Sequence, residues 1–182
     1  MMDDDSYRQR IQAIHQKLGI PHDYEEHYGV PLQYEASHLV DAGYDMFGRS
    51  QQMDPVTFKH WLEMRNAALD QNVQLLLVSA FRGVDYQATI IERKLKQGLS
   101  IENVLASSAA PGYSEHHSGR ALDLTVIDCP PLVEAFEETR AFVWLCDNAD
   151  RFGFFMSYPR DGQNKIIYEP WHWLLKSGYS NA

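Results

Sequence analysis

The chain has 182 residues, of which 45% are hydrophobic and 23% are charged, and its formal net charge is −9. This length and composition predict a single globular domain, residues 1–182, that is large enough to bury a core. The acidic balance argues against nucleic acid or an anionic membrane surface as a partner, so we expect neither.

The N-terminus and the two cysteines bear on the cellular compartment. Residues 1–5 are acidic and lack the basic start and apolar core of a signal peptide. No apolar run approaches the length that spans a bilayer. Cys129 and Cys146 do not have metal-site spacing, and we expect free thiols rather than a disulfide scaffold. A cytoplasmic location is therefore the expectation.

The first fifty residues are expected to form an N-terminal extension that packs on the core. Tyr7, Ile11 and Leu18 recur at helical spacing, and Gly19 then ends the predicted helix. Residues 19–54 are interrupted by glycines and prolines, so irregular structure with short elements is expected there. This part either forms a wall of a substrate cleft or simply completes the core.

The next segment predicts a helix followed by a buried strand. Asp54 is a capping acid, and Pro55 suits the first helical position, so a helix is expected to begin here and to end near residue 70. Residues 73–79 are rich in apolar side chains. A continuous apolar run is typical of a central strand that is covered on both faces.

A second helix is predicted over residues 84–97, with Gly98 as its stop. Arg82 therefore lies on a strand-to-helix connection, where functional groups are commonly held. Residues 100–105 form a short helical segment at most. Residues 106–113 are small and polar and are expected to line a cleft.

The C-terminal third predicts one more helix and several strands. Asp123 lies in a predicted strand that begins near Ala121, and a helix is expected over residues 140–150. The side chains expected to face inward from that helix are Phe142, Leu145, Cys146 and Ala149.

Residues 154–158 and 165–168 are predicted strands joined by a turn at Asp161–Gly162, and residues 171–174 form the last strand. The predicted fold class is thus α+β: a small, mostly antiparallel sheet that carries the functional site, with flanking helices.

Two motifs supply chemistry. Residues 114–123 read S-x-H-x-x-G-x-A-x-D, and residues 169–172 read E-x-x-H. His116, Asp123 and His172 provide two imidazoles and one carboxylate, and Glu169 is a spare carboxylate. Three protein ligands, an open position for water and a nearby general base are the components of a catalytic zinc site.

Other histidines compete for these roles. His117 could bind the metal in place of His116, although adjacent side chains usually point apart. His15, His22, His27 and His38 show no shared pattern, and we expect them to be surface or structural residues.

A third motif completes a resemblance to a known family. Residues 79–87, Ser-Ala-Phe-Arg-Gly-Val-Asp-Tyr-Gln, are similar to S-G-[FY]-R-S-x-x-x-Q. All three motifs, in this order, resemble those of the zinc D-Ala-D-Ala and L,D-carboxypeptidases of bacterial cell-wall metabolism, which are VanY-like enzymes. Their clan includes lysostaphin-type peptidases and the hedgehog signalling domain. The resemblance covers residues 73–176, the expected carboxypeptidase core, and implies a hedgehog/DD-peptidase-like sheet with flanking helices.

The resemblance implies a zinc-dependent carboxypeptidase that removes the C-terminal D-alanine from peptidoglycan-derived peptides. Zn²⁺ would be bound by His116, Asp123 and His172, with Glu169 as the general base. Arg82 would bind either the terminal carboxylate of the substrate or the tetrahedral oxyanion. The implied substrate-binding residues are Ser114 and Gln87, which would hydrogen-bond the end of the substrate, and Tyr158 and Trp171, which either shape the pocket or pack in the core.

The substrate is expected to be a stem peptide or muropeptide, and L,D-carboxypeptidase activity on a tetrapeptide is favoured over D-Ala-D-Ala carboxypeptidase activity. Two alternatives stay open. One is a peptidoglycan endopeptidase of the same clan, although such enzymes usually carry their base in a D-x-P-H-like stretch. The other is a zinc-containing binding module without catalysis, against which Glu169 and Arg82 argue. The sequence does not predict the oligomeric state.

Overall fold

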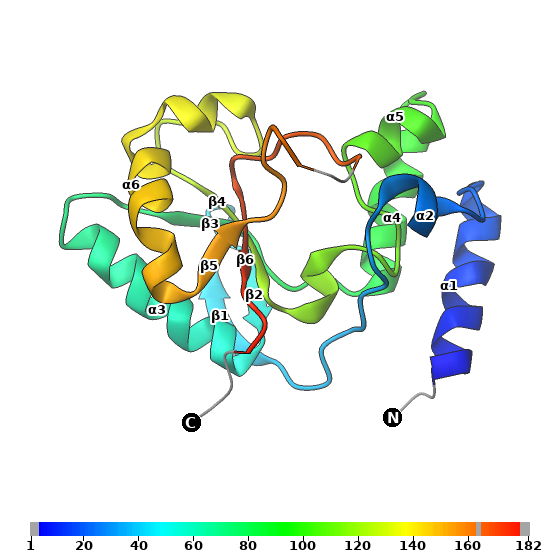
Figure 1. Cartoon of the computed structure of the whole chain (residues 1–182), viewed down its shortest axis with the longest axis horizontal. Coiled ribbons are helices and arrows are strands. Elements are labelled where there is room, and N and C mark those ends of the chain that lie inside the picture. Colours follow the sequence, from blue (N-terminus) through cyan, green and yellow to red (C-terminus); the bar gives the residue numbers. More distant parts are fainter. Residues whose placement is uncertain (1–3, 163–164, 179–182) are drawn as a thin grey trace.

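The computed structural model describes residues 4–162 and 165–178. Its helices are α1 (Asp4–Leu18), α2 (Tyr24–Tyr28), α3 (Pro55–Leu69), α4 (Val84–Lys96), α5 (Ile101–Ala106) and α6 (Arg140–Asn148), with the short 3₁₀ helices η1 (Glu115–Ser118), η2 (Glu134–Glu138) and η3 (Ala149–Phe152). Its strands are β1 (Val40–Tyr44), β2 (Ser50–Met53), β3 (Leu76–Ser79), β4 (Ala121–Thr125), β5 (Phe154–Met156) and β6 (His172–Leu175). Helices thus surround small antiparallel sheets, which confirms the predicted fold class (Figure 1).

The larger sheet carries the motif residues. Its four strands have the order β3-β4-β6-β5, and every neighbouring pair is antiparallel. All five residues of β4 are buried. Across the β4–β6 ladder Asp123 is paired with His172, so strand register alone places these two motif residues side by side.

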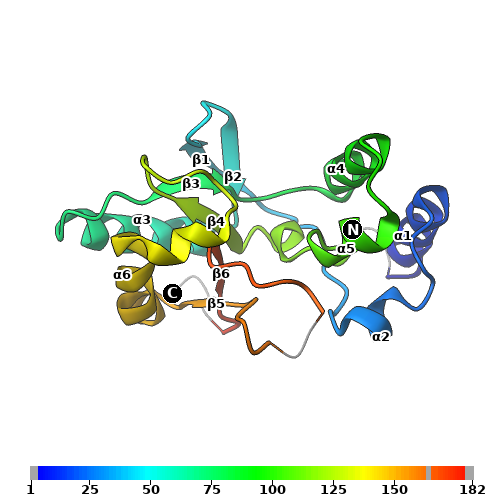
Figure 2. The same cartoon turned by 90° about the horizontal axis from the view of Figure 1, so that it is seen from above.

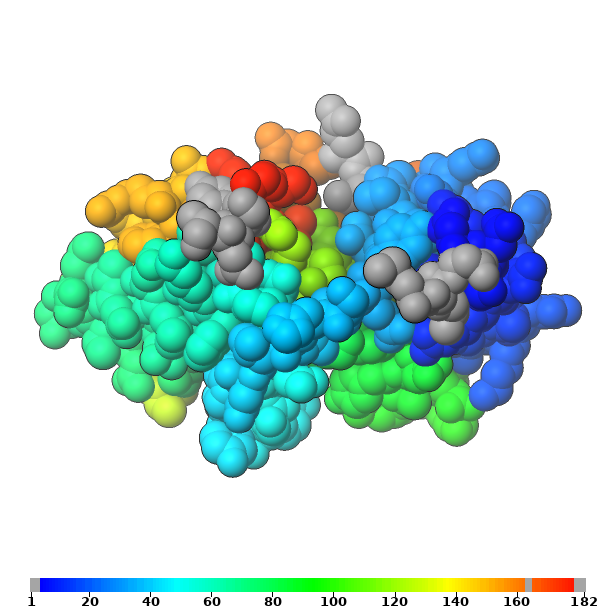
Figure 3. Space-filling view, turned by 90° about the horizontal axis from the view of Figure 1, so that it is seen from below, coloured from blue at the N-terminus to red at the C-terminus, as the bar shows by residue number. Residues whose placement is uncertain are grey.

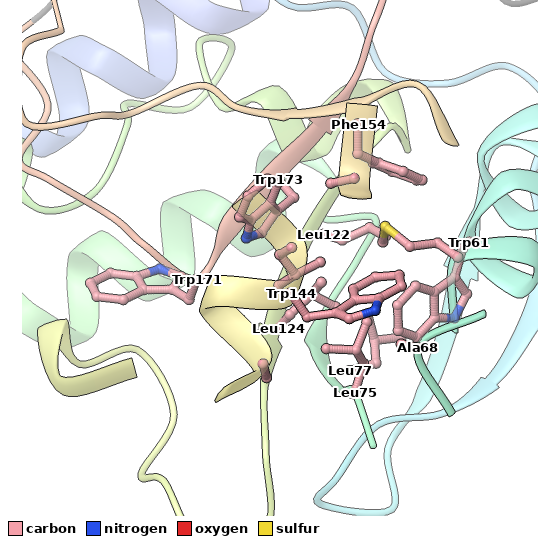
Figure 4. Packing of buried hydrophobic residues seen from close by; sticks show 14 of the residues in the cluster. Trp61, Ala68, Leu75, Leu77, Leu122, Leu124, Trp144, Phe154, Trp171 and Trp173 are labelled. Carbon is pink, nitrogen blue, oxygen red and sulfur yellow. The ribbon is translucent and has the colours of Figure 1, made fainter. Parts of the chain in front are cut away.

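The main hydrophobic core lies between this sheet and helices α3 and α6. Figure 4 shows the rings of Trp61, Trp144 and Phe154 and the side chain of Leu122 gathered in this core. Burial of each such side chain contributes about 1.5–3 kcal/mol, which makes this core the main stabilising unit under the sheet. Helix α3 begins as predicted, because the Asp54 carboxylate accepts hydrogen bonds from the first-turn backbone.

A second group of helices covers the other end of the molecule. Figures 1 and 2 place α1, α2, α4 and α5 away from α3 and α6, with strand β6 between the two groups. Helix α1 packs against α4, and the blue N-terminal segment lies beside the green α4 region in Figure 3. Ile11 of α1 packs so closely on Gly112 that a Cβ there would lie 2.8 Å from its Cδ1 atom.

The structure corrects the expectation that residues 73–79 form a central strand. Strand β3 is shorter and lies at the edge of its sheet. The side chains of this segment are apolar because residues such as Leu75 and Leu77 pack in the main core. A hairpin of β1 and β2 covers the open edge of the strand. The Met46 N–H donates to the Leu77 carbonyl at 2.8 Å, and the Phe81 N–H donates to the Gln52 carbonyl at 3.0 Å.

Two smaller expectations are also wrong. Residues 165–168 are not a strand; the backbone there bends, and its Lys165 N–H donates to the Tyr28 carbonyl instead of a sheet neighbour. At the expected turn, the Gly162 N–H donates to the Pro159 carbonyl at 3.1 Å, and residues 163–164 lie outside the described residues. Cys146 is exposed, because Trp144 and Leu145 take the inward face of α6. Cys129 and Cys146 are both free thiols, as predicted.

In the ranges 4–162 and 165–178, no helix combines the length and apolarity needed to cross a bilayer.

Candidate active site

The residues predicted as metal ligands form one buried cluster. His116 comes from η1, Asp123 from β4 and His172 from β6, and one ligand atom of each lies within 4.8 Å of the others. Gly119, at a φ of +68°, makes the turn that joins η1 to β4. An added Cβ at this position would lie 2.8 Å from the backbone nitrogen of Asp54, so the turn has no room for a side chain.

The hydrogen bonds of His116 aim its free nitrogen at the cluster. Its Nδ1 lies 2.5 Å from the Ala80 carbonyl oxygen, which can only accept, so the ring proton belongs on Nδ1. The Nε2 lone pair therefore faces the Asp123 carboxylate, whose Oδ2 is 3.2 Å away. This buried nitrogen has no hydrogen-bond partner in the part of the chain that the structure describes. Two electron-pair donors facing each other in this way suit a cation between them.

His172 is also oriented by a contact at one ring nitrogen, which leaves the other nitrogen facing the cluster. Its Nε2 lies 2.8 Å from Glu115 Oε2, and its Nδ1 lies 3.0 Å from Asp123 Oδ1. With the proton on Nε2, Nδ1 also presents a lone pair to the cluster. Two imidazole nitrogens and one carboxylate oxygen form a donor set that suits zinc.

The pKa values of the two histidines indicate that the cluster can hold a positive charge. Burial, together with Arg82, lowers the pKa of His116 to about 4, so this imidazole is neutral. Burial also acts to lower the pKa of His172, but its hydrogen bonds to Asp123 and Glu115 outweigh burial and raise the pKa to about 10. In the protein without a metal, a proton on His172 thus balances the two carboxylates. A divalent cation would displace that proton.

Glu115 is a residue of this site that the sequence analysis missed. Its carboxylate accepts a hydrogen bond from the Ser157 hydroxyl at 2.6 Å in addition to its contact with His172. A carboxylate on the second nitrogen of a ligand histidine fixes the ring orientation and its tautomer. Its position in the motif, directly before His116, was the only available signal.

Glu169 lies beside the cluster rather than in it. Its Oε2 is 3.8 Å from His172 Nδ1. Burial is the largest influence on this carboxyl and, with the nearby Asp123, raises its pKa to about 7 despite the opposing effects of His172 and Arg82. A carboxyl that titrates near neutrality is suited to accept and return a proton.

All the predicted substrate-binding residues line the same cleft as the cluster. The cleft has a volume of about 360 Å³. The predicted site residues along its wall are Arg82, Gln87, Ser114, His116, Asp123, Tyr158, Glu169, Trp171 and His172. Trp171 also belongs to the main core, so its ring serves both packing and the cleft. Of residues 4–54, only Phe47 and Arg49 line the cleft, and the rest of the N-terminal part packs elsewhere.

Two polar groups in the cleft wall are available to hydrogen-bond a ligand. Arg82 Nε and Gln87 Oε1 are buried, and within the described residues neither has a hydrogen-bond partner. Gln87 is fixed at its other end, where its Nε2 donates to the Ala109 carbonyl at 2.7 Å. An unmatched donor and an unmatched acceptor in one cleft favour a ligand that has both kinds of group.

His117 does not take part in the cluster. Its Nδ1 lies 2.5 Å from the Arg82 carbonyl oxygen, and its Nε2 accepts a hydrogen bond from the Gly112 N–H at 3.0 Å. Both ring nitrogens are therefore occupied, and His117 ties the Arg82 connection to the loop before the motif. His15, at the far end of the molecule, is bonded to the Pro111 carbonyl.

A buried His–Asp–His cluster with a neighbouring carboxyl of raised pKa, open to a cleft, has the arrangement of a metal-dependent hydrolase. A family model described as "VanY: D-alanyl-D-alanine carboxypeptidase" matches residues 50–177. The chain therefore belongs to the VanY family of D-alanyl-D-alanine carboxypeptidases, as the three motifs predicted.

Similarity to individual proteins also supports membership of this family. The chain is 31% identical over 153 residues to YodJ of Bacillus subtilis (strain 168), a match that covers 80% of this chain and 55% of YodJ. It thus spans about half the length of that curated relative. The structure of the LD-carboxypeptidase LdcB is similar at 30% identity with a TM-score of 0.70, covering 80% of this chain and 71% of LdcB. A glutamate-to-alanine mutant of the vancomycin-resistance D,D-pentapeptidase VanY, in complex with Zn(II), is similar at 25% identity with a TM-score of 0.62, covering 80% and 82%.

Proposed function

We propose that this protein is a zinc-dependent carboxypeptidase that hydrolyses the C-terminal D-alanine from peptidoglycan-derived peptides. The observation that carries the proposal is the buried cluster of His116, Asp123 and His172, which directs three ligand atoms to one point beside Glu169. The names of the relatives support it: LdcB is an LD-carboxypeptidase, and the VanY structure is a zinc complex.

The residues of the cluster would hold the metal through His116 Nε2, His172 Nδ1 and the Asp123 carboxylate. Zinc bound there would supply Lewis acidity toward water and the scissile carbonyl. Glu115 keeps the His172 ring in the orientation that this requires, because it occupies the other ring nitrogen.

Glu169 has the role of general base. It takes the proton of the attacking water and then returns it to the leaving amine of D-alanine. Arg82 provides the positive charge that this reaction needs near the scissile bond. Gln87 and Ser114, both buried in the cleft wall, are neutral groups that hydrogen-bond the end of the peptide.

We favour the tetrapeptide, and hence L,D-activity, over the pentapeptide. LdcB gives a higher identity and TM-score than the D,D-pentapeptidase VanY. In the cytoplasmic location that we propose, an L,D-enzyme would act on recycled peptides and would leave the precursors that end in D-Ala-D-Ala intact.

The role of Glu169 is tested with the zinc-loaded Glu169→Ala variant. We expect it to keep stoichiometric zinc by elemental analysis and to lose nearly all D-alanine release from muropeptides. Release at the wild-type rate would remove Glu169 from the mechanism. The Glu138→Ala variant is a matched control, since Glu138 lies outside the cleft.

A further inference from the structure

Residues 33–36, on the connection between α2 and β1, are bonded to the loops that form the cleft (Figure 1). The Gln33 N–H donates to the Gly112 carbonyl at 2.7 Å. The Ala36 N–H donates to the His117 carbonyl at 2.8 Å. The N-terminal part of the chain therefore supports the backbone of the active-site loops at residues that do not themselves line the cleft.

Glu35 is the side chain that links this connection to α4. Its Oε1 accepts a hydrogen bond from the Val84 N–H at 2.7 Å, and its Oε2 accepts one from Arg10 Nη1 at 2.8 Å. Arg10 Nη2 also lies 2.9 Å from Asp85 Oδ2, so one arginine binds both Glu35 and the first turn of α4. Gly83, the residue before α4, has no side chain with which to cap the helix. Glu35 thus takes the place of the capping side chain at the start of α4.

Arg82, two residues before Val84, is held through its backbone. Its Nε is buried and, in the part of the chain that the structure describes, has no hydrogen-bond partner. The Arg82 N–H donates to the His116 carbonyl at 3.2 Å, and the Arg82 carbonyl oxygen lies 2.5 Å from His117 Nδ1. The position of the guanidinium group in the cleft therefore depends on how firmly the backbone of residues 82–84 is held.

Two routes of bonded neighbours join Glu35 to Arg82. The direct route is the bond from Glu35 to the Val84 N–H. The second route begins at the next residue, because Ala36 is bonded to the His117 carbonyl and the His117 ring is bonded to the Arg82 carbonyl. The Val84 side chain is also fully buried, where it packs with residues of α1. A change at Glu35 therefore acts directly on the backbone that carries Arg82.

We propose that Glu35, held by Arg10, is a positioning residue for Arg82 in the reaction. This inference rests on the proposed function, which gives Arg82 its role at the scissile bond. Glu35 precedes the residues 50–177 that the family model matches. The catalytic unit of this chain thus includes part of its N-terminal extension.

The first test measures D-alanine release by zinc-loaded Glu35→Ala and Glu35→Gln. The alanine removes the acceptor for the Val84 N–H, whereas the glutamine keeps an oxygen that can accept it. Misplacement of a catalytic group by about 1 Å can cost about 100-fold in rate, so Glu35→Ala should lower kcat by about 10- to 100-fold with little change in KM. Glu35→Gln should keep most of the activity. Glu26→Ala, at an exposed position of α2, is the matched control and should leave kcat unchanged.

The Arg82→Ala background separates positioning from a general structural defect. There, Glu35→Ala should cost much less than in the wild-type background, because the group that it positions has been removed. A structural defect would lower the activity by the same factor in both backgrounds, and that result would overturn the proposal.

The nuclear magnetic resonance signal of the Arg82 Nε–H group gives a readout without turnover. The signal is assigned by its loss in Arg82→Ala. Glu35→Ala should shift and broaden it, and Glu35→Gln should leave it near the wild-type position. This readout decides the proposal even if the wild type releases no D-alanine, and an unchanged signal in Glu35→Ala would overturn it. Arg10→Met removes only the partner of Glu35, should show the same change at a smaller size, and takes the place of Glu35→Ala if that variant does not fold.

Discussion

Replacement of Glu115 should perturb the proposed metal site while all three proposed ligands stay in place. Its carboxylate lies 2.8 Å from His172 Nε2 and accepts the Ser157 hydroxyl at 2.6 Å. In Glu115→Gln the side-chain shape is kept and an amide oxygen can still accept from the imidazole, but the negative charge is lost. In Glu115→Ala the orientation of the His172 ring is lost as well. The two variants therefore separate charge from orientation.

The expected magnitudes follow from these contacts. A hydrogen bond to a charged group contributes about 1.5–3 kcal/mol and a neutral one about 0.5–1.5 kcal/mol, so Glu115→Gln should weaken zinc binding by about 10-fold. Loss of both effects in Glu115→Ala should reach the upper part of the range of about 10- to 100-fold that is typical for such partners of metal ligands.

The assay is a competition titration of zinc against a chromophoric chelator, at a fixed pH near 7. Glu137→Gln is a suitable control, because Glu137 binds Tyr168 and Arg160 away from the cleft. If Glu115→Ala binds zinc as tightly as the control variant, the contact with His172 has no part in holding the metal, and the reasoning fails.

Two further predictions concern stability. Burial alone would raise the pKa of the Asp45 carboxyl. The carboxylate accepts hydrogen bonds from the backbone and side chain of Arg49 and from the Phe47 N–H, and together these bonds hold the pKa below its usual value. Asp45→Asn should lower the free energy of unfolding by about 1–3 kcal/mol at pH 7, measured by urea denaturation. Because the folded-state pKa is the lower one, this difference is present above pH ~4 and shrinks as the pH falls through the folded-state pKa; a difference that grows in acid would contradict it. Gly119→Ala should cost more than about 1 kcal/mol, since its φ is +68° and the new Cβ would meet the Asp54 backbone, and it should cost more than Gly43→Ala, whose Cβ has no neighbour within 4 Å.

Much of the fold could be predicted because local signals agree with tertiary packing. Helix α3 has its cap and proline at the start, and α4 ends at Gly98 as its pattern indicates. The strand that carries Asp123 is also where the sequence places it. These segments bury a continuous apolar face, so periodicity is informative for them.

The hairpin of β1 and β2 had no such signal. Its strands are short and contain glycine and glutamine rather than an alternating apolar face. It is held instead by the buried Asp45 and by long-range bonds to the β3 edge, such as the Ala80 N–H to Gln51 Oε1 bond at 3.0 Å. Contacts of this kind do not appear as local periodicity, and for the same reason β3 was expected at the centre of the sheet.

The candidate site also contains some residues that the sequence reveals and others that only the fold reveals. His116, Asp123 and His172 could be selected from motif spacing, and the structure brings them together as a cluster. Their catalytic roles remain predictions. Glu115 could not be selected, because its contact with the site depends on His172, a distant residue that only the fold brings near.

The most direct measurement is mass spectrometry of the products formed from muropeptides that end in one or two D-alanines, with zinc-loaded protein and a chelator control. The account predicts loss of one alanine from the tetrapeptide, abolished by the chelator and restored by zinc. Loss from the pentapeptide alone would retain the carboxypeptidase and reverse the favoured specificity. Release of no alanine from either peptide by the zinc-loaded protein would contradict the central claim.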